Sequence, residues 1–316
     1  MPARRAPSAP VRAITALALA GVLSACALTA PGPAPRPAPS GAPRAEPPSA
    51  ASLALAGYYR DLQAGLLDRG LLRTDPGIPD APFNARMLTE TFVRVALYDE
   101  FQRGPGGYVA RETPSILRRW EGPVRLSLRF GASVPESRRA TERARVASLL
   151  ARLSRVTGHP IRLQDSGANF FLYIVNEDER RALGPEIAAA MPGFGAAEIN
   201  AFTRMPPATY CQVSAMSRAD SGVYTRALAV TRAEHPDLLH LSCLHEEIVQ
   251  GLGLPNDWAR ARPSVFNDDQ EFALLTPLDE AMLRLLYDPA LRPGMTEAEA
   301  RPIVESLAKA LMGGES

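Results

Sequence analysis

The sequence carries almost no excess charge, and it lacks the common catalytic motifs. Its 35 lysine and arginine residues oppose 34 aspartate and glutamate residues, which leaves a net charge of +1 at pH 7. Such a balance gives no electrostatic basis for binding nucleic acid. The sequence contains no Gly-x-Ser-x-Gly nucleophile elbow and no dinucleotide-binding glycine fingerprint. We therefore expect no nucleic-acid partner, and any function has to come from a less common site.

The first 25 residues have the pattern of a secretory signal peptide. Three arginines precede or flank a short apolar stretch over 13–23, which is too short to cross a bilayer because spanning takes about 20 apolar residues. The next residues, Leu-Ser-Ala-Cys ending at Cys26, resemble the bacterial lipobox, in which the cysteine becomes the lipidated first residue. We predict a signal peptide over 1–25, a lipid on Cys26 and a place on the periplasmic side of the cell envelope. Ala27, where an aspartate would indicate the inner membrane, favours the outer membrane.

A proline-rich segment separates the predicted anchor from the rest of the chain. Residues 27–50 contain eight prolines among alanine, glycine and serine. Proline has no backbone N–H to donate, and the segment has little apolar bulk to bury, so we expect an extended spacer. The lipidated cysteine and this linker together span 26–50. Beyond them we predict a helical N-terminal extension over 51–120 and an α+β domain over 121–316.

Hydrophobic periodicity predicts the elements of these regions. Helices are expected over 51–70, 84–101, 135–157, 177–190, 236–252, 277–287 and 296–312. Strands are expected over 124–130, 160–164, 169–175, 209–215 and 223–231. Strands interleaved with helices, after a helical start, predict the α+β class.

Two cysteines remain once Cys26 is assigned to the lipid. Cys211 and Cys243 form an even pair in a chain predicted to be exported, so we expect a disulfide between them. The alternative is a reactive Cys243 assisted by His245. Residues two apart on a helix do not face each other, and the compartment is oxidising, so the disulfide is favoured.

One segment invites comparison with zinc peptidases. Starting at His245, the motif His-Glu-x-x-His would need a second histidine at position 249, which is valine. Starting at Glu246, the pattern is Glu-Glu-x-x-Gln-x-x-Gly-x-x-Asn-Asp. It resembles the metzincin motif His-Glu-x-x-His-x-x-Gly-x-x-His-Asp with each histidine replaced. Glu246, Gln250 and Asn256 stand in the three ligand positions.

The resemblance to metzincins extends beyond the ligand positions. Glu247 stands where the peptidase general base would be, and Gly253 stands where the chain turns back after the helix. Downstream, the segment 264–267 resembles the Met-turn, with Phe266 in place of the methionine. The order of strands and helices from Val124 onward also resembles that fold, which implies a zincin-like domain.

The chain also resembles a family of bacterial lipoproteins known only as a domain of unknown function. The resemblance covers nearly all of residues 51–295. It is carried by four segments: Arg118 to Val124, Glu246 to Asp257, Phe266 to Asp269, and Tyr287 to Pro289. This family implies no activity.

The replaced ligands determine the expected chemistry. Glu246, Gln250 and Asn256 offer one charge and two neutral oxygens, whereas catalytic zinc is held by histidine or cysteine. Without a strong Lewis acid, Glu247 has no activated water to deprotonate. We therefore expect no cofactor, a hydrogen-bonded cluster of these residues, and a non-catalytic protein that binds a peptide or an envelope protein. Two alternatives stay open: an oxygen-ligand site for Ca²⁺ or Mg²⁺ on the same three residues, and an active metal-dependent hydrolase with Glu247 as general base.

Overall fold

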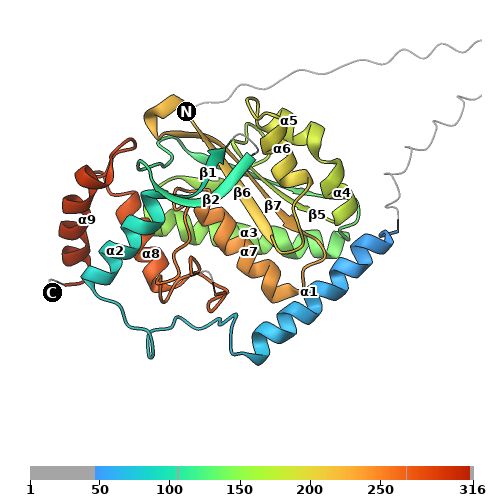
Figure 1. Cartoon of the computed structure of the whole chain (residues 1–316), viewed down its shortest axis with the longest axis horizontal. Helices are drawn as coiled ribbons and strands as arrows, with labels where there is room; N and C mark the ends of the chain where they lie inside the picture. The colour runs from blue at the N-terminus through green and yellow to red at the C-terminus, as the bar shows by residue number, and fades with distance from the viewer. Residues whose placement is uncertain (1–46, 105–106, 268, 314–316) are drawn as a thin grey trace, which may run out of the picture. The chain divides into compact units, whose positions relative to one another are not determined.

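The computed structural model describes residues 47–104, 107–267 and 269–313, without the side chains of residues 100–111 and 220 (Figure 1). The predicted signal peptide, Cys26 and most of the linker lie outside these residues. No helix in the described part of the chain is long and apolar enough to span a membrane. The described residues from 47 onward belong to one compact unit, so the helices before residue 120 pack with the rest.

A mixed five-stranded sheet forms the centre of the molecule, in the order β4-β3-β5-β7-β6. Neighbouring pairs among β4, β3, β5 and β7 run parallel, whereas β6 runs antiparallel to β7 at one edge. The bounds are β3 Val124–Phe130, β4 Ile161–Leu163, β5 Phe170–Val175, β6 Cys211–Ser217 and β7 Tyr224–Arg232. Every residue of β5 is buried, as expected for a central parallel strand covered on both faces.

Helices cover both faces of this sheet. Alternate side chains of a strand point to opposite faces, and β5 shows this directly: Phe170 and Leu172 belong to one core, Phe171 and Tyr173 to another. The first core is closed by α3 (Glu136–Thr157), α7 (Asp237–Gln250) and α8 (Pro277–Leu286). The second is closed by α5 (Gly184–Ala190) and α6 (Ala196–Thr203), and α4 (Glu177–Ala182) packs beside β5 and α6.

The N-terminal helices attach to this core at two places. The helix α1 (Ala50–Asp68) lies against the start of α7, where the ring of Tyr59 is 4.5 Å from that of His235 and the Leu239 N–H donates to Gln63 at 2.9 Å. The helix α2 (Ala85–Ala96) packs against α9 (Glu297–Leu311) and α8. Between α2 and β3 the chain forms an antiparallel hairpin of β1 (Tyr98–Gly104) and β2 (Gly107–Pro114). A 3-10 turn, η1 (Ala219–Ser221), joins β6 to β7.

The predicted α+β class is confirmed, and two local predictions are wrong. The helix expected over 84–101 ends at Ala96, because the aromatic residues on either side of a glycine-containing turn favour the β1–β2 hairpin. The helix expected over 177–190 is two helices, since a new one begins at Gly184-Pro185 and proline is suited to the first turn of a helix but not to its interior. The short helix α6 was not anticipated.

The predicted disulfide between Cys211 and Cys243 is confirmed. The two Cα atoms are 5.9 Å apart, and the bond joins residues separated by 32 positions. It connects the edge strand β6 to α7, the helix that carries the metzincin-like pattern.

Candidate functional site

The candidate site is the C-terminal half of α7, the helix that follows strand β7 in the chain. Leu244, Ile248 and Val249 fix the rotation of this helix because they are buried in the core beneath the sheet. Glu247 is buried with them at 3% exposure, whereas Glu246 is half-buried. The two neighbouring carboxylates therefore occupy different environments on adjacent faces.

Two glycines allow the chain to turn at the end of α7. A Cβ atom on Gly251 would lie 2.5 Å from the ring of Phe170, and the Gly251 carbonyl accepts a 2.8 Å hydrogen bond from the indole of Trp120. Gly253 has φ +128°, and a Cβ there would lie 2.2 Å from the carbonyl oxygen of Arg118. The turn expected at Gly253 is thus present, and only glycine fits it.

Two of the three predicted ligand positions, Gln250 and Asn256, hydrogen-bond to residues outside the set. The Gln250 side chain donates to Asp257, with Nε2 3.3 Å from Oδ1. Asn256 is buried, and its Nδ2 donates to the carbonyl of Arg94 at 2.9 Å, at the end of α2. Glu246 has other polar or electrostatic contacts, as do Glu247 and Asp257. The structure therefore brings Gln250 to Asp257 and directs the Asn256 amide nitrogen toward α2.

His245, the histidine just before the pattern, accepts a hydrogen bond from the loop before α8. The Leu275 N–H donates to its Nδ1 at 3.0 Å, so in the neutral ring the proton sits on Nε2. Burial, aided by the positive charge of Arg152, lowers the pKa of His245 to about 4. The ring is therefore neutral at physiological pH.

The segment between α7 and α8 is held by a buried carboxylate, Asp279. It accepts hydrogen bonds from the Ser264 hydroxyl at 2.5 Å, the Val265 N–H at 3.2 Å and the Thr276 N–H at 2.8 Å. Burial raises the pKa of Asp279 to about 6, although these donors oppose the shift. Phe266 is fully buried. Asp279 had no assigned role in the sequence, although the pair Thr276 and Asp279 has the spacing of a helix capping box.

Three of the segments that carry the family resemblance meet just after α7. Arg119 donates to the carbonyls of Leu286 and Asp288, the latter at 3.1 Å. The Tyr287 hydroxyl donates to the Leu252 carbonyl at 2.9 Å, just after α7. These bonds join the chain just after α7 to the chain just after α8.

A zinc ion does not fit the donor set that the sequence pattern indicates. That set has one carboxylate and two neutral amide oxygens, without the histidine or cysteine that holds catalytic zinc. Among the described histidine, cysteine, aspartate and glutamate residues, no three are grouped as a metal site requires. Asp268, in the acidic loop, lies outside the described residues. The donor chemistry of the pattern therefore gives no basis for holding zinc at this helix.

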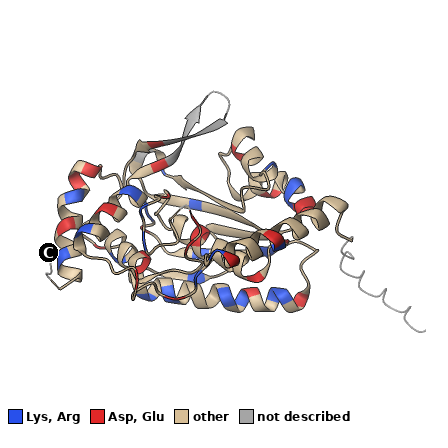
Figure 2. Ribbon diagram, turned by 60° about the horizontal axis from the view of Figure 1, so that its bottom comes forward, with Lys and Arg blue, Asp and Glu red and all other residues tan. Residues whose placement is uncertain are grey.

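Charged residues of both signs are interspersed along the helices (Figure 2).

A family model described as protein of unknown function (DUF2927) matches residues 85–306. No curated protein and no solved structure matches the sequence.

Proposed function

Because the chain belongs to the DUF2927 family, whose function is unknown, its role has to be inferred from its own site, and we propose a non-catalytic, lipid-anchored binding protein of the cell envelope. One observation carries this proposal. Asn256 stands where the third ligand of a peptidase metal would be, but it offers only a neutral amide oxygen there, and it is buried with its amide nitrogen closing the end of α2. A residue that holds two helices together in this way supports a structural role for the whole pattern.

The arrangement around α7 supports kinship with zincin-like domains. The helix with the pattern follows the strand beside the antiparallel edge strand, and the chain turns back at Gly253. The order of elements from Val124 onward agrees with the same kinship. We propose that the ligand histidines of such an ancestor were replaced and that the scaffold was kept for binding.

The edge strand β6 offers the surface for a peptide partner. Its residues are half-exposed, and within the described ranges its strand partner is β7 alone. An extended peptide can add to such an edge by main-chain hydrogen bonds. The disulfide fixes β6 to α7, so a peptide along β6 would lie near the helix that carries Glu246 and Gln250.

The lipid anchor completes the proposal and has a direct test. The linker over 27–49 allows a reach of at most about 80 Å at 3.3–3.6 Å per residue, so the folded part can work at a distance from the membrane. We expect Cys26→Ala to abolish metabolic labelling with an alkyne fatty acid and to release the chain from the membrane fraction. Labelling that persists in this variant would contradict the assignment.

Metal content tests the non-catalytic role. The full chain, purified in detergent, should contain far less than one equivalent of zinc, calcium or magnesium by elemental analysis. The variants Glu246→Ala and Glu305→Ala, the second an exposed control on α9, should give the same low value. A stoichiometric metal that only Glu246→Ala removes, with a peptidase activity that Glu247→Gln abolishes, would establish the hydrolase instead.

Hydrogen exchange tests the binding surface. Peptides selected from a displayed library against the full chain should slow amide exchange within Cys211–Ser217. Protection confined to other elements would show that β6 is not the docking edge.

A further inference from the structure

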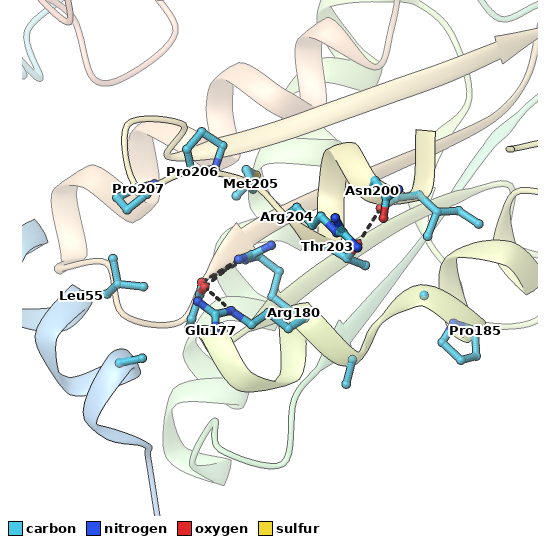
Figure 3. A pocket seen from close by; sticks show the side chains of 15 residues that line it. Leu55, Glu177, Arg180, Pro185, Asn200, Thr203, Arg204, Met205, Pro206 and Pro207 are labelled. Carbon is cyan, nitrogen blue, oxygen red and sulfur yellow. Dashed lines mark hydrogen bonds and ion pairs between the residues drawn. The ribbon is translucent and has the colours of Figure 1, made fainter. Parts of the chain in front are cut away.

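A second candidate site lies among the helices that cover the other face of the sheet. A cavity of about 810 Å³ opens there between α1, α4, α6 and the loop after α6 (Figure 3). Leu55 of α1 and Met205 of the loop contribute apolar walls, and Arg180, Arg181 and Arg204 contribute charge. Nothing in the proposed function uses this cavity, whose volume is in the range of small-molecule sites.

One buried carboxylate organises the floor of this cavity. Glu177 accepts a hydrogen bond from Arg180 at 2.8 Å, from Arg181 at 2.7 Å and from Arg232 at 2.5 Å. Burial by itself raises the pKa of Glu177, but the guanidinium groups outweigh it and hold that pKa below the ordinary value. The carboxylate is therefore charged, and it is shared by three cations.

Two of these arginines, Arg180 and Arg232, hold the surrounding elements together and are too buried to contact a ligand. The side chains of Arg180 and Arg232 are 1% and 0% exposed. Arg180 also donates to the Phe202 carbonyl at 2.6 Å, and Arg232 to the Met205 carbonyl at 2.9 Å. These bonds tie α6 and its following loop to α4 and β7, so the cavity has a fixed shape.

The remaining arginines leave positive charge at the opening. Arg181 is 63% exposed and uses its Nε on Glu177, and its two terminal nitrogens have no hydrogen bond to another described residue. The exposed Arg204 side chain likewise makes none within the described part of the chain. Three arginines against one glutamate give the lining a net charge of +2. Asn200 and Thr203 add neutral polar groups beside them.

We propose that this cavity binds the phosphate group of a small organic ligand, with Arg181 and Arg204 as its contacts. One guanidinium group can hydrogen-bond both oxygens of a carboxylate, whereas a phosphate has enough oxygens to accept hydrogen bonds from two guanidinium groups at once. A dianionic phosphate monoester also matches the net charge of the lining. The apolar walls would hold the organic part.

Two kinds of ligand carry such a phosphate group, a lipid headgroup and a soluble phosphate ester. Ala51, in the first turn of α1, lines the cavity, and α1 follows the linker directly. A lipid on Cys26 would keep anionic headgroups within reach of this end of the molecule, and a soluble phosphate ester would reach it by diffusion. The shared chemistry is the phosphate, and the test separates the sources.

Calorimetric titration of the full chain in detergent tests the proposal. The probes are glycerol 3-phosphate, water-soluble short-chain phosphatidylglycerol, the zwitterionic phosphatidylcholine of the same chain length, and succinate. We expect at least one of the first two to bind, and Arg181→Gln with Arg204→Gln to weaken that binding at least tenfold. Both substituted side chains are exposed, so the fold should be retained, which circular dichroism checks. Arg260→Gln, an exposed arginine outside the cavity, is the matched control and should change affinity less than twofold.

The outcomes separate the sources and can overturn the proposal. Arginine-dependent binding of glycerol 3-phosphate indicates a soluble ester, and such binding of phosphatidylglycerol alone indicates a headgroup. Failure of both phosphates to bind overturns the proposal. So does phosphate binding that is unchanged in the double variant, or succinate binding as tight as that of the phosphates.

Discussion

The side chain of Asn256 donates a hydrogen bond to the backbone carbonyl of Arg94, 162 positions earlier in the chain, at 2.9 Å. The Asn256 N–H also donates to the neighbouring Val95 carbonyl at 3.1 Å. Carbonyls in the last turn of a helix have no partner within it. Asn256 therefore closes the end of α2 from outside, and a position that resembles a metal ligand acts as a helix cap.

Removing this cap should destabilise the fold. Asn256→Ala leaves the Arg94 carbonyl without this donor in a partly buried place, and orphaning a buried polar group costs about 1–3 kcal/mol. We expect that loss in the free energy of unfolding measured with urea. Asn200→Ala, an exposed asparagine on α6 with no side-chain hydrogen bond to a described residue, is the control and should change it by less than about 0.5 kcal/mol. Equal losses in the two variants would refute the capping role.

His245 should make stability depend on pH on the acid side. Its pKa is about 4 in the folded chain against 6.5 for the unperturbed group, so between these values the unfolded chain binds more protons. Its contribution is therefore complete above pH 6.5 and is lost as the pH falls toward 4. The loss amounts to at most about 3 kcal/mol, from 1.36 kcal/mol per pKa unit.

The variant His245→Gln isolates this effect. Glutamine retains an oxygen that can accept from the Leu275 N–H, but it does not titrate in this range. The free energy of unfolding, measured with urea at several pH values, should fall less steeply for the variant than for the unaltered chain between pH 6.5 and 4. If the free energy of unfolding fell equally steeply with pH in both proteins, the His245 ring would not be a buried neutral acceptor.

The disulfide should contribute substantially to stability. It closes a loop of 32 positions between β6 and α7, and the chain-entropy relation gives about 3–4 kcal/mol for that length. The double variant Cys211→Ala with Cys243→Ala should lose this amount. The unaltered chain under reducing conditions provides the comparison, and its unfolding midpoint should fall to near that of the variant. A reduced chain as stable as the oxidised one would exclude a structural role for the bond.

Local signals in the sequence predicted much of the scaffold. Alternation of apolar residues marked β3, and a continuous apolar run marked the buried strand β5. The even pair of cysteines left in a chain predicted to be exported was enough to pair Cys211 with Cys243. Gly253 was predicted as a turn because its conformation is a property of one residue and its neighbours.

The roles of the site residues depend on contacts between distant segments, which local patterns do not encode. The spacing of Glu246 and Gln250 was visible, but the pairing of Gln250 with Asp257 and of Asn256 with α2 depends on how the chain returns after α7. The same holds for the floor of the cavity. Glu177 and Arg180 are three apart on one helix, whereas Arg232 arrives from β7.

Two glycines with opposite requirements provide the last test. Gly253 has a positive φ and lies against the carbonyl of Arg118, so a methyl group there meets both backbone strain and a steric clash. Gly65, inside α1, has open space around the position of a Cβ, and alanine is favoured over glycine in a helix by about 0.5–1 kcal/mol. The same chemical change should therefore have opposite effects at the two sites.

The measurement is the free energy of unfolding of the two variants side by side. Gly253→Ala should lose at least about 2 kcal/mol, since the backbone strain alone is of order 1–3 kcal/mol and the Arg118 carbonyl cannot move without disturbing the end of α7. Gly65→Ala should gain up to about 1 kcal/mol. If Gly253→Ala were as stable as the unaltered chain, the turn after α7 would not be the fixed feature that sets Gln250 beside Asp257, and the interpretation of the pattern as a structural closure would fail with it.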